Sequence, residues 1–169
     1  MKRRDFLLTG TALAGGHALA DLPKVRTLDE ALGWLATLEK APGARSTGAW
    51  PLVSMLDHMA QSVEMSMDGF PQLKSEMFQK TAGAAAFAFF KWRGRMSHGL
   101  NEPIPGAPAL SNAADWHAAA ARLRAAIVRF EQYQGPLKPH FAYGVLDKAA
   151  FTVAHVLHIA NHQDDILLA

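Results

Sequence analysis

The segment 154–165, AHVLHIANHQDD, places three histidines and two aspartates within a short stretch near the C-terminus. On a helical wheel that advances about 100° per residue, one stripe of this segment collects the side chains of His155, His158, His162 and Asp165. The same stripe carries apolar residues, so it faces a core. Buried polar groups without partners cost about 1–3 kcal/mol each. The stripe must therefore meet a metal ion, a hydrogen-bond network or a wet cleft.

The spacing of the histidines restricts which of them can share one ion. His155 and His162 lie about 10.5 Å apart along a helix axis, which two metal–nitrogen bonds of about 2.0–2.1 Å cannot span. The pair is therefore His158 with His162, or His155 with His158, since both spacings place rings on adjacent turns. Neutral imidazole is a ligand for Zn, Ni, Co and Fe. A third protein ligand has to come from another helix.

The segment 51–67, PLVSMLDHMAQSVEMSM, offers the candidate for that third ligand. Pro51 suits the first turn of a helix because its missing N–H is not needed there. His58 lies on the shoulder of the apolar stripe, about 110° from its centre, which fits a site near an opening of a bundle. The stripe is formed by Leu52, Met55, Leu56, Met59 and Val63.

The rest of the chain has the pattern of further amphipathic helices. A capping box at 27–30 opens a helix to about Lys40, and Asp147 can cap the last helix, which is expected over 148–168. Helices are also expected over 74–96 and 113–133, with their apolar stripes toward the core. We expect no strand. These elements predict an all-α fold, an up-down-up-down four-helix bundle with one extra or irregular helix and long loops. The two stripes are Phe78, Ala82, Ala85, Phe89 and Trp92, and Trp116, Ala120, Leu123, Ile127 and Phe130.

The first twenty residues are expected to be a targeting segment. Arg3 and Arg4 precede a short apolar run, and the small-residue ending at Ala18–Ala20 fits signal cleavage. This order resembles a twin-arginine (Tat) export signal. The resemblance implies recognition by the Tat machinery, a periplasmic location and no stable membrane insertion after cleavage. The mature protein would be a single domain, residues 21–169.

Composition excludes several classes of function. The chain has 17 Lys and Arg against 15 Asp and Glu, and removal of residues 1–20 leaves the two signs balanced. A neutral domain offers no footprint for nucleic acid or anionic lipid, and the cluster 91–95 is interpreted as a solvated helix end. The chain has no cysteine, which excludes disulfides, thiolate metal ligands and a cysteine nucleophile. No phosphate-binding glycine loop or nucleophile elbow occurs.

Three motifs then carry a family resemblance over residues 27–168. They are LDHMAQSVE (56–64), PHFAYGVLDKAAF (139–151) and HIANHQDDI (158–166). In order and spacing they resemble the DinB/YfiT-like superfamily of metal-binding four-helix bundles, and in particular a branch of uncharacterised domains. The resemblance implies that His58, His158 and His162 bind a divalent metal ion, Zn or Ni. His155 departs from the three-histidine pattern. It would orient a ligand, contact substrate, or replace His162.

The functional expectation is a metal-dependent enzyme of hydrolase or transferase type that acts on an unknown small molecule. Three protein ligands leave a coordination position open, as catalytic sites do, and Asp165 or His155 would be the acid/base. Two alternatives stay open: a non-catalytic metal-binding or sensing module, and a structural bundle whose histidines form a network without metal. The resemblance also allows a homodimer, although no residue demands one. His98, His117 and His140 are interpreted as ordinary, and the methionines as core filling.

Overall fold

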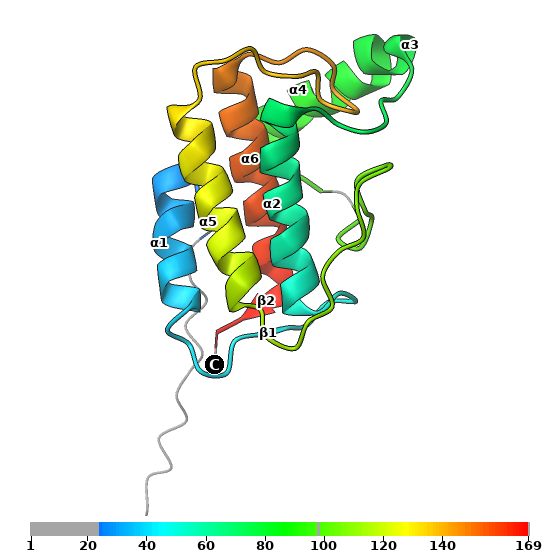
Figure 1. The fold of residues 1–169 in the computed structure, drawn as a ribbon. Coiled ribbons are helices and arrows are strands. Elements are labelled where there is room, and N and C mark those ends of the chain that lie inside the picture. The colour runs from blue at the N-terminus through cyan, green and yellow to red at the C-terminus, as the bar shows by residue number, and fades with distance from the viewer. Residues whose placement is uncertain (1–23, 98, 169) are drawn as a thin grey trace, which may run out of the picture.

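The structure is a computed structural model that describes residues 24–97 and 99–168. The expected export signal, with His17, lies outside the described residues, as does His98. Four helices lie side by side as a bundle (Figure 1), and this confirms the all-α prediction. They are α1 (Leu28–Leu38), α2 (Leu52–Asp68), α5 (His117–Gln132) and α6 (Lys148–His162).

The helices begin where the capping residues predict. The Thr27 hydroxyl oxygen accepts a hydrogen bond from the Glu30 N–H at 3.1 Å, and the Asp147 carboxylate accepts one from the Ala150 N–H at 2.7 Å. Each bond satisfies one of the free N–H groups of a first helical turn. The local sequence therefore fixes the start of α1 and of α6 before any packing is considered.

The direction of the helices differs from simple alternation at one point. Arg122 of α5 pairs with Glu64 of α2, and one turn or more further along both helices Arg129 pairs with Asp68. Because the later residue of α2 pairs with the later residue of α5, the two helices run parallel. The long connection 69–116 returns the chain to the end from which α2 started, as crossover connections do in other bundles.

Helix α2 is buried on nearly every side, including polar positions that a surface helix would expose. The loop before α5 explains this burial. Ser54 donates its hydroxyl to the Ser111 carbonyl at 2.7 Å, the Asp57 carboxylate accepts from the Ser111 N–H at 3.0 Å, and Gln61 donates to the Pro108 carbonyl at 3.1 Å. The loop thus covers α2 and forms one wall of the space beside it.

The C-terminal end corrects two expectations. Helix α6 ends at His162 instead of continuing to 168, and a 3-10 turn, η2 (Gln163–Asp165), follows it. A strand was not expected, yet β2 (Ile166–Leu167) pairs antiparallel with β1 (Arg45–Ser46). The extended backbone at Ile166, a β-branched residue, favours the strand over a further helical turn. The ladder ties the loop between α1 and α2 to the chain end.

The segment after α2 corrects a third expectation. A continuous helix over 74–96 was predicted, but the segment consists of α3 (Glu76–Phe78), a π-helical turn η1 (Gln79–Gly83) and α4 (Ala84–Arg93). The stripe expected in the core lies outside, because Phe89 is 47% and Trp92 81% exposed. The opposite face packs inward through Phe87, which is 7% exposed. Both faces of α4 are apolar, so periodicity alone could not choose between them.

The described residues contain no helix that is long and apolar enough to cross a membrane. Apolar residues of the bundle helices form a buried hydrophobic core. The predicted stripes of α2 and α5 lie in it, and Met55, Met59, Met65 and Met67 fill it as expected.

Candidate metal centre

Three imidazole rings converge between α2 and α6. His58 comes from the middle of α2, and His158 and His162 come from successive turns of α6. The His158 Nε2 atom lies 3.1 Å from His58 Nε2 and 3.0 Å from His162 Nε2. One ligand atom from each of the three residues lies within 4.8 Å of the others. The structure thus selects the His158/His162 pair over His155/His158.

All three rings are buried. His58 is 3% exposed, His158 8% and His162 0%. The Trp50 ring meets the His58 ring edge-on with centroids 5.2 Å apart. His58 was expected on the shoulder of its helix near an opening, and it does reach the wall of a cavity while remaining buried. A ring with so little freedom holds its nitrogen in one place at little entropic cost.

The chemistry of this donor set fits a tetrahedral metal ion. Metal–nitrogen bonds of about 2.0–2.1 Å at tetrahedral angles separate the nitrogens by about 3.3 Å, close to the two distances found. A hydrogen-bonded reading is more demanding. His158 Nε2 would have to share one N–H between His58 and His162, or accept from both through one lone pair, because a neutral ring nitrogen either donates or accepts. A shared cation satisfies all three lone pairs at once.

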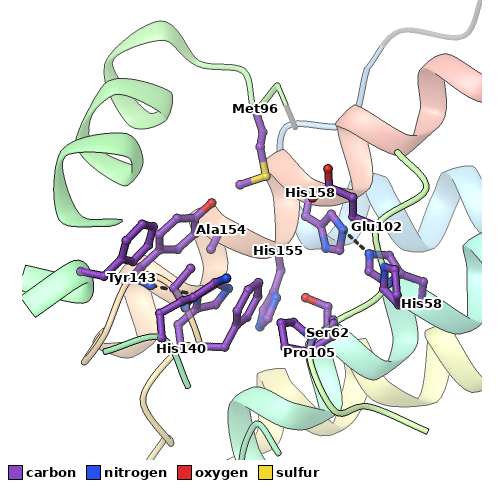
Figure 2. Close-up of a pocket in the computed structure, with 16 residues that line it drawn as sticks. His58, Ser62, Met96, Glu102, Pro105, His140, Tyr143, Ala154, His155 and His158 are labelled. Carbon is purple, nitrogen blue, oxygen red and sulfur yellow. Dashed lines mark hydrogen bonds between the residues drawn. The ribbon is translucent and has the colours of Figure 1, made fainter. Parts of the chain in front are cut away.

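A cavity of about 370 Å³ adjoins this centre. His58 and His158 are on its wall (Figure 2), whereas His162 is not among the residues that line it. An ion held by the three rings would therefore lie at the wall of the cavity. The wall combines apolar and polar groups: Phe78, Met96, Ile104 and Phe141, with Ser62, Lys74, Glu102, His140 and His155.

His155 lies on the same cavity wall, apart from the three-histidine cluster. Its Nε2 lies 3.2 Å from the hydroxyl of Ser66, which itself donates to the Val63 carbonyl. The ring nitrogen therefore carries the proton and donates it to Ser66. Complete burial lowers the pKa of His155 to about 3. A ring this hard to protonate is suited to accept a hydrogen bond from a ligand and poorly suited to take up its proton near neutral pH.

His140, first interpreted as an ordinary loop histidine, is also part of the cavity wall. Its Nδ1 accepts hydrogen bonds from the N–H groups of Ala142 and Tyr143, at 3.1 and 3.2 Å. The Tyr143 ring stacks on it with centroids 4.2 Å apart. Burial, with a smaller contribution from His155, lowers the pKa of His140 to about 3, and burial raises the pKa of Tyr143 to about 12. The turn is thus a rigid, neutral wall.

The structure does not bring Asp165 to the cavity. The helix on which its wheel position was based ends three residues earlier. Asp165 lies in η2, where its carbonyl accepts a hydrogen bond from the Thr47 N–H at 2.8 Å. Its carboxylate packs against the backbone of Gly48, so close that a side chain at Gly48 would collide with it. This position suits a role in holding the loop between α1 and α2.

Glu102 is the acidic side chain that the sequence did not reveal. It lies in the loop 99–116 and lines the cavity at the end that holds His58 and His158 (Figure 2). Glu102 lies in a loop, after Gly99 and before Pro103 and Pro105, so no helical or strand periodicity indicates where its side chain points. The path of its loop brings it to the site, and hydrogen bonds at Ser111 hold the later part of that loop against α2.

Comparison with known proteins identifies a family for this chain. The family described as "Protein of unknown function (DUF1569)" matches residues 19–167. No curated protein and no solved structure matches the chain.

Proposed function

We propose that this chain, which belongs to the DUF1569 family, binds one divalent transition-metal ion through His58, His158 and His162. The observation that carries the proposal is the convergence of three buried imidazole nitrogens at the wall of a cavity. Zn or Ni suits an all-nitrogen donor set. We also assign the chain to the DinB/YfiT-like superfamily, because ligands from the second bundle helix and from an HxxxH pair in the last helix are what that resemblance implies.

The best-supported activity is a metal-dependent hydrolase or transferase acting on a small molecule. A metal ion bound by three protein ligands supplies a Lewis acid and lowers the pKa of a bound water or thiol. The chain's own residues would do the rest. Phe78 and Phe141 would hold an apolar part of the substrate, and His155 would accept a hydrogen bond from it.

Glu102 is our candidate for proton transfer, in preference to Asp165. Its carboxylate lines the cavity and is exposed to solvent, so a proton can leave from it. The two acid/base candidates from the sequence are less suitable. Asp165 lies off the cavity wall, and the low pKa of His155 disfavours it as a base near neutral pH.

Metal analysis of the purified protein tests the binding proposal. We expect one equivalent of metal per chain, lost in a His58→Ala/His162→Ala double variant. His117→Ala is the matched control, since His117 is an exposed histidine on α5 that pairs with Asp115. Metal retained by the double variant, or absent from the unmodified protein after growth and dialysis with zinc, would overturn the proposal.

Turnover separates the enzyme from a non-catalytic metal-binding or sensing module. We expect hydrolysis or transfer within a panel of ester, amide and thiol substrates, with kcat reduced by Glu102→Gln and metal content unchanged. A fully loaded protein that turns over nothing in the panel would favour the sensing module. The chain has no His-rich or Met-rich tract for loading many ions, which argues against metal storage.

Export to the periplasm is a separate proposal that rests on residues 1–20. Arg3 and Arg4, the short apolar run and Ala18–Ala20 support it. We expect the chain in the periplasmic fraction, shortened to begin at Asp21, and retained in the cytoplasm by an Arg3→Lys/Arg4→Lys variant. Unchanged fractionation of that variant would contradict a twin-arginine route.

A further inference from the structure

We infer that the segment 73–97 docks this protein onto an anionic lipid surface. The inference is independent of the metal centre. It starts from the outer face of α4, where Ala85, Ala88, Phe89 and Trp92 repeat at the helical spacing i, i+3, i+4 and i+7. All four are exposed, Trp92 by 81%. The helix packs against the rest of the protein through its opposite face, where Phe87 stacks on Tyr143 with ring centroids 5.1 Å apart.

The two most exposed aromatic side chains of α4 are neighbours on its outer face. The Phe89 and Trp92 rings lie 5.8 Å apart. At the other end of the segment Met77 is 78% exposed, and Leu73 before it 52%. In Figure 1 the segment from α3 to α4 projects from the side of the bundle. Large apolar side chains that cluster on a projecting element mark an interaction site.

Charge identifies the kind of partner. Five cationic side chains and one acidic one lie in this segment, whereas the remaining described residues carry nine cationic and twelve acidic ones. The near-neutral total therefore conceals a basic face. No ion pair within the described part of the chain involves the three cations that follow Phe90. The cationic side chains are Lys74, Lys80, Lys91, Arg93 and Arg95.

An anionic bilayer fits this surface better than other occupants. Trp and Phe on one face with Lys and Arg around them is the composition of helices that lie in a lipid interface. Each cation near an anionic surface adds attraction, and the aromatic rings bury at headgroup depth. A second copy would bring two basic faces together, and the N-terminal segment carries Lys2, Arg3 and Arg4, so both would repel this surface.

The surface also touches the cavity. Phe78 is 40% exposed and lines the cavity, and Met96 just beyond α4 lines it too. Docking through α4 would therefore bring the cavity wall close to the lipid, where apolar small molecules concentrate.

Vesicle co-sedimentation of the full chain tests the inference. We expect binding to phosphatidylcholine vesicles that contain about one third phosphatidylglycerol, at least tenfold weaker binding to phosphatidylcholine alone, and loss on raising the salt concentration. A Phe89→Ser/Trp92→Ser variant should bind at least tenfold more weakly. A Lys91→Gln/Arg93→Gln/Arg95→Gln variant should bind more weakly and with a smaller salt dependence.

Matched controls separate this surface from general stickiness. Val145→Ser removes an apolar residue that is 85% exposed elsewhere, and Arg26→Gln/Lys40→Gln/Arg45→Gln removes three exposed cations from another face. Lys2→Gln/Arg3→Gln/Arg4→Gln tests the N-terminal segment. All three should bind as the unmodified chain does.

Three results would overturn the inference. The first is equal binding by the α4 variants and the unmodified chain. The second is no preference for the anionic vesicles. The third is a concentration-dependent dimer, abolished by Trp92→Ser, in a chain that binds no vesicles, since a second copy would then be the partner.

Discussion

Helices α6 and α4 depart in opposite ways from the rule that apolar side chains are buried and polar ones exposed. Helix α6 turns three imidazoles into the protein, whereas α4 turns two large aromatic rings out of it. In α6 the polar groups lie inside because partners meet them there: His58 across the interface and Ser66 beside His155. In α4 the apolar groups lie outside because the inward face is already filled by Phe87. Residues in the unexpected layer are where a function should be sought.

The largest expected effect comes from removing one of the buried imidazoles. His162→Ala should weaken zinc affinity about a thousandfold, roughly 4 kcal/mol, because the binding energy of the ion is shared among only three protein ligands. Competition with a chromophoric chelator measures it. The zinc-dependent rise in Tm should disappear as well. Since His117 lies outside the cluster, His117→Ala should bind zinc as the unmodified chain does. Equal zinc affinity of the His162→Ala and His117→Ala variants would contradict metal binding by the buried imidazoles.

The stability of the protein at low pH should depend on two other buried imidazoles, those of His140 and His155. Burial lowers the pKa of His140 and His155 to about 3, so below the ordinary value of 6.5 the unfolded chain binds protons that the folded chain does not. Stability is therefore complete above that value and is lost as the pH falls toward 3. At pH 5 the loss should be about 2 kcal/mol for each ring, or about 4 kcal/mol together.

Urea unfolding of the metal-free protein at pH 7.5 and pH 5 measures this loss. His155→Leu removes one of these two rings, so the difference between the two pH values should shrink by about 2 kcal/mol in this variant. A difference that stays the same would mean that His155 titrates normally in the folded protein. The metal-free state matters because proton-coupled release of the ion would otherwise add to the slope.

The two faces of α4 can be compared within one helix. Phe87→Ala should lower the free energy of unfolding by about 3 kcal/mol, since it leaves a cavity next to Tyr143. Trp92→Ala should change it by less than about 0.5 kcal/mol, because the side chain is already in solvent. Equal costs for the two variants, measured by urea unfolding, would mean that Trp92 packs against something in solution.

These two regions also show how far the sequence could be interpreted. Local rules were sufficient where one stretch contained the whole signal: the caps at Thr27 and Asp147, the α5 stripe, and the HxxxH pair of α6. The cluster of His58 with His158 and His162 also matches the set implied by the family resemblance.

The failures share a cause, which is that tertiary contacts decided between local alternatives. Asp165 left the predicted stripe because Ser46 pairs with Ile166 and ends the helix early. Glu102 reached the cavity through the path of its loop, the later part of which is hydrogen-bonded to α2. The orientation of α4 depends on a turn some sixty residues later in the chain, which no window of sequence around Phe89 contains.

Gly83 joins the two regions, and its substitution should give a small effect with an informative sign. It begins α4 against the turn that lines the cavity, and a Cβ built on it would lie 1.9 Å from the Ala142 carbonyl oxygen. Backbone cannot move aside as a flexible side chain can. Gly83→Ala should therefore lower the free energy of unfolding by about 1–2 kcal/mol, the cost of overpacking less the better helix propensity of alanine.

Gly33→Ala is the matched control, because Gly33 lies in α1 with nothing within 4 Å of the added Cβ. That variant should be stabilised by about 0.5–1 kcal/mol. Opposite signs for the two substitutions would establish that close packing against the 140–144 turn, rather than helix propensity, fixes α4. If both stabilise, α4 is free to move relative to the turn, and its exposed aromatic face cannot be assigned a fixed place beside the cavity.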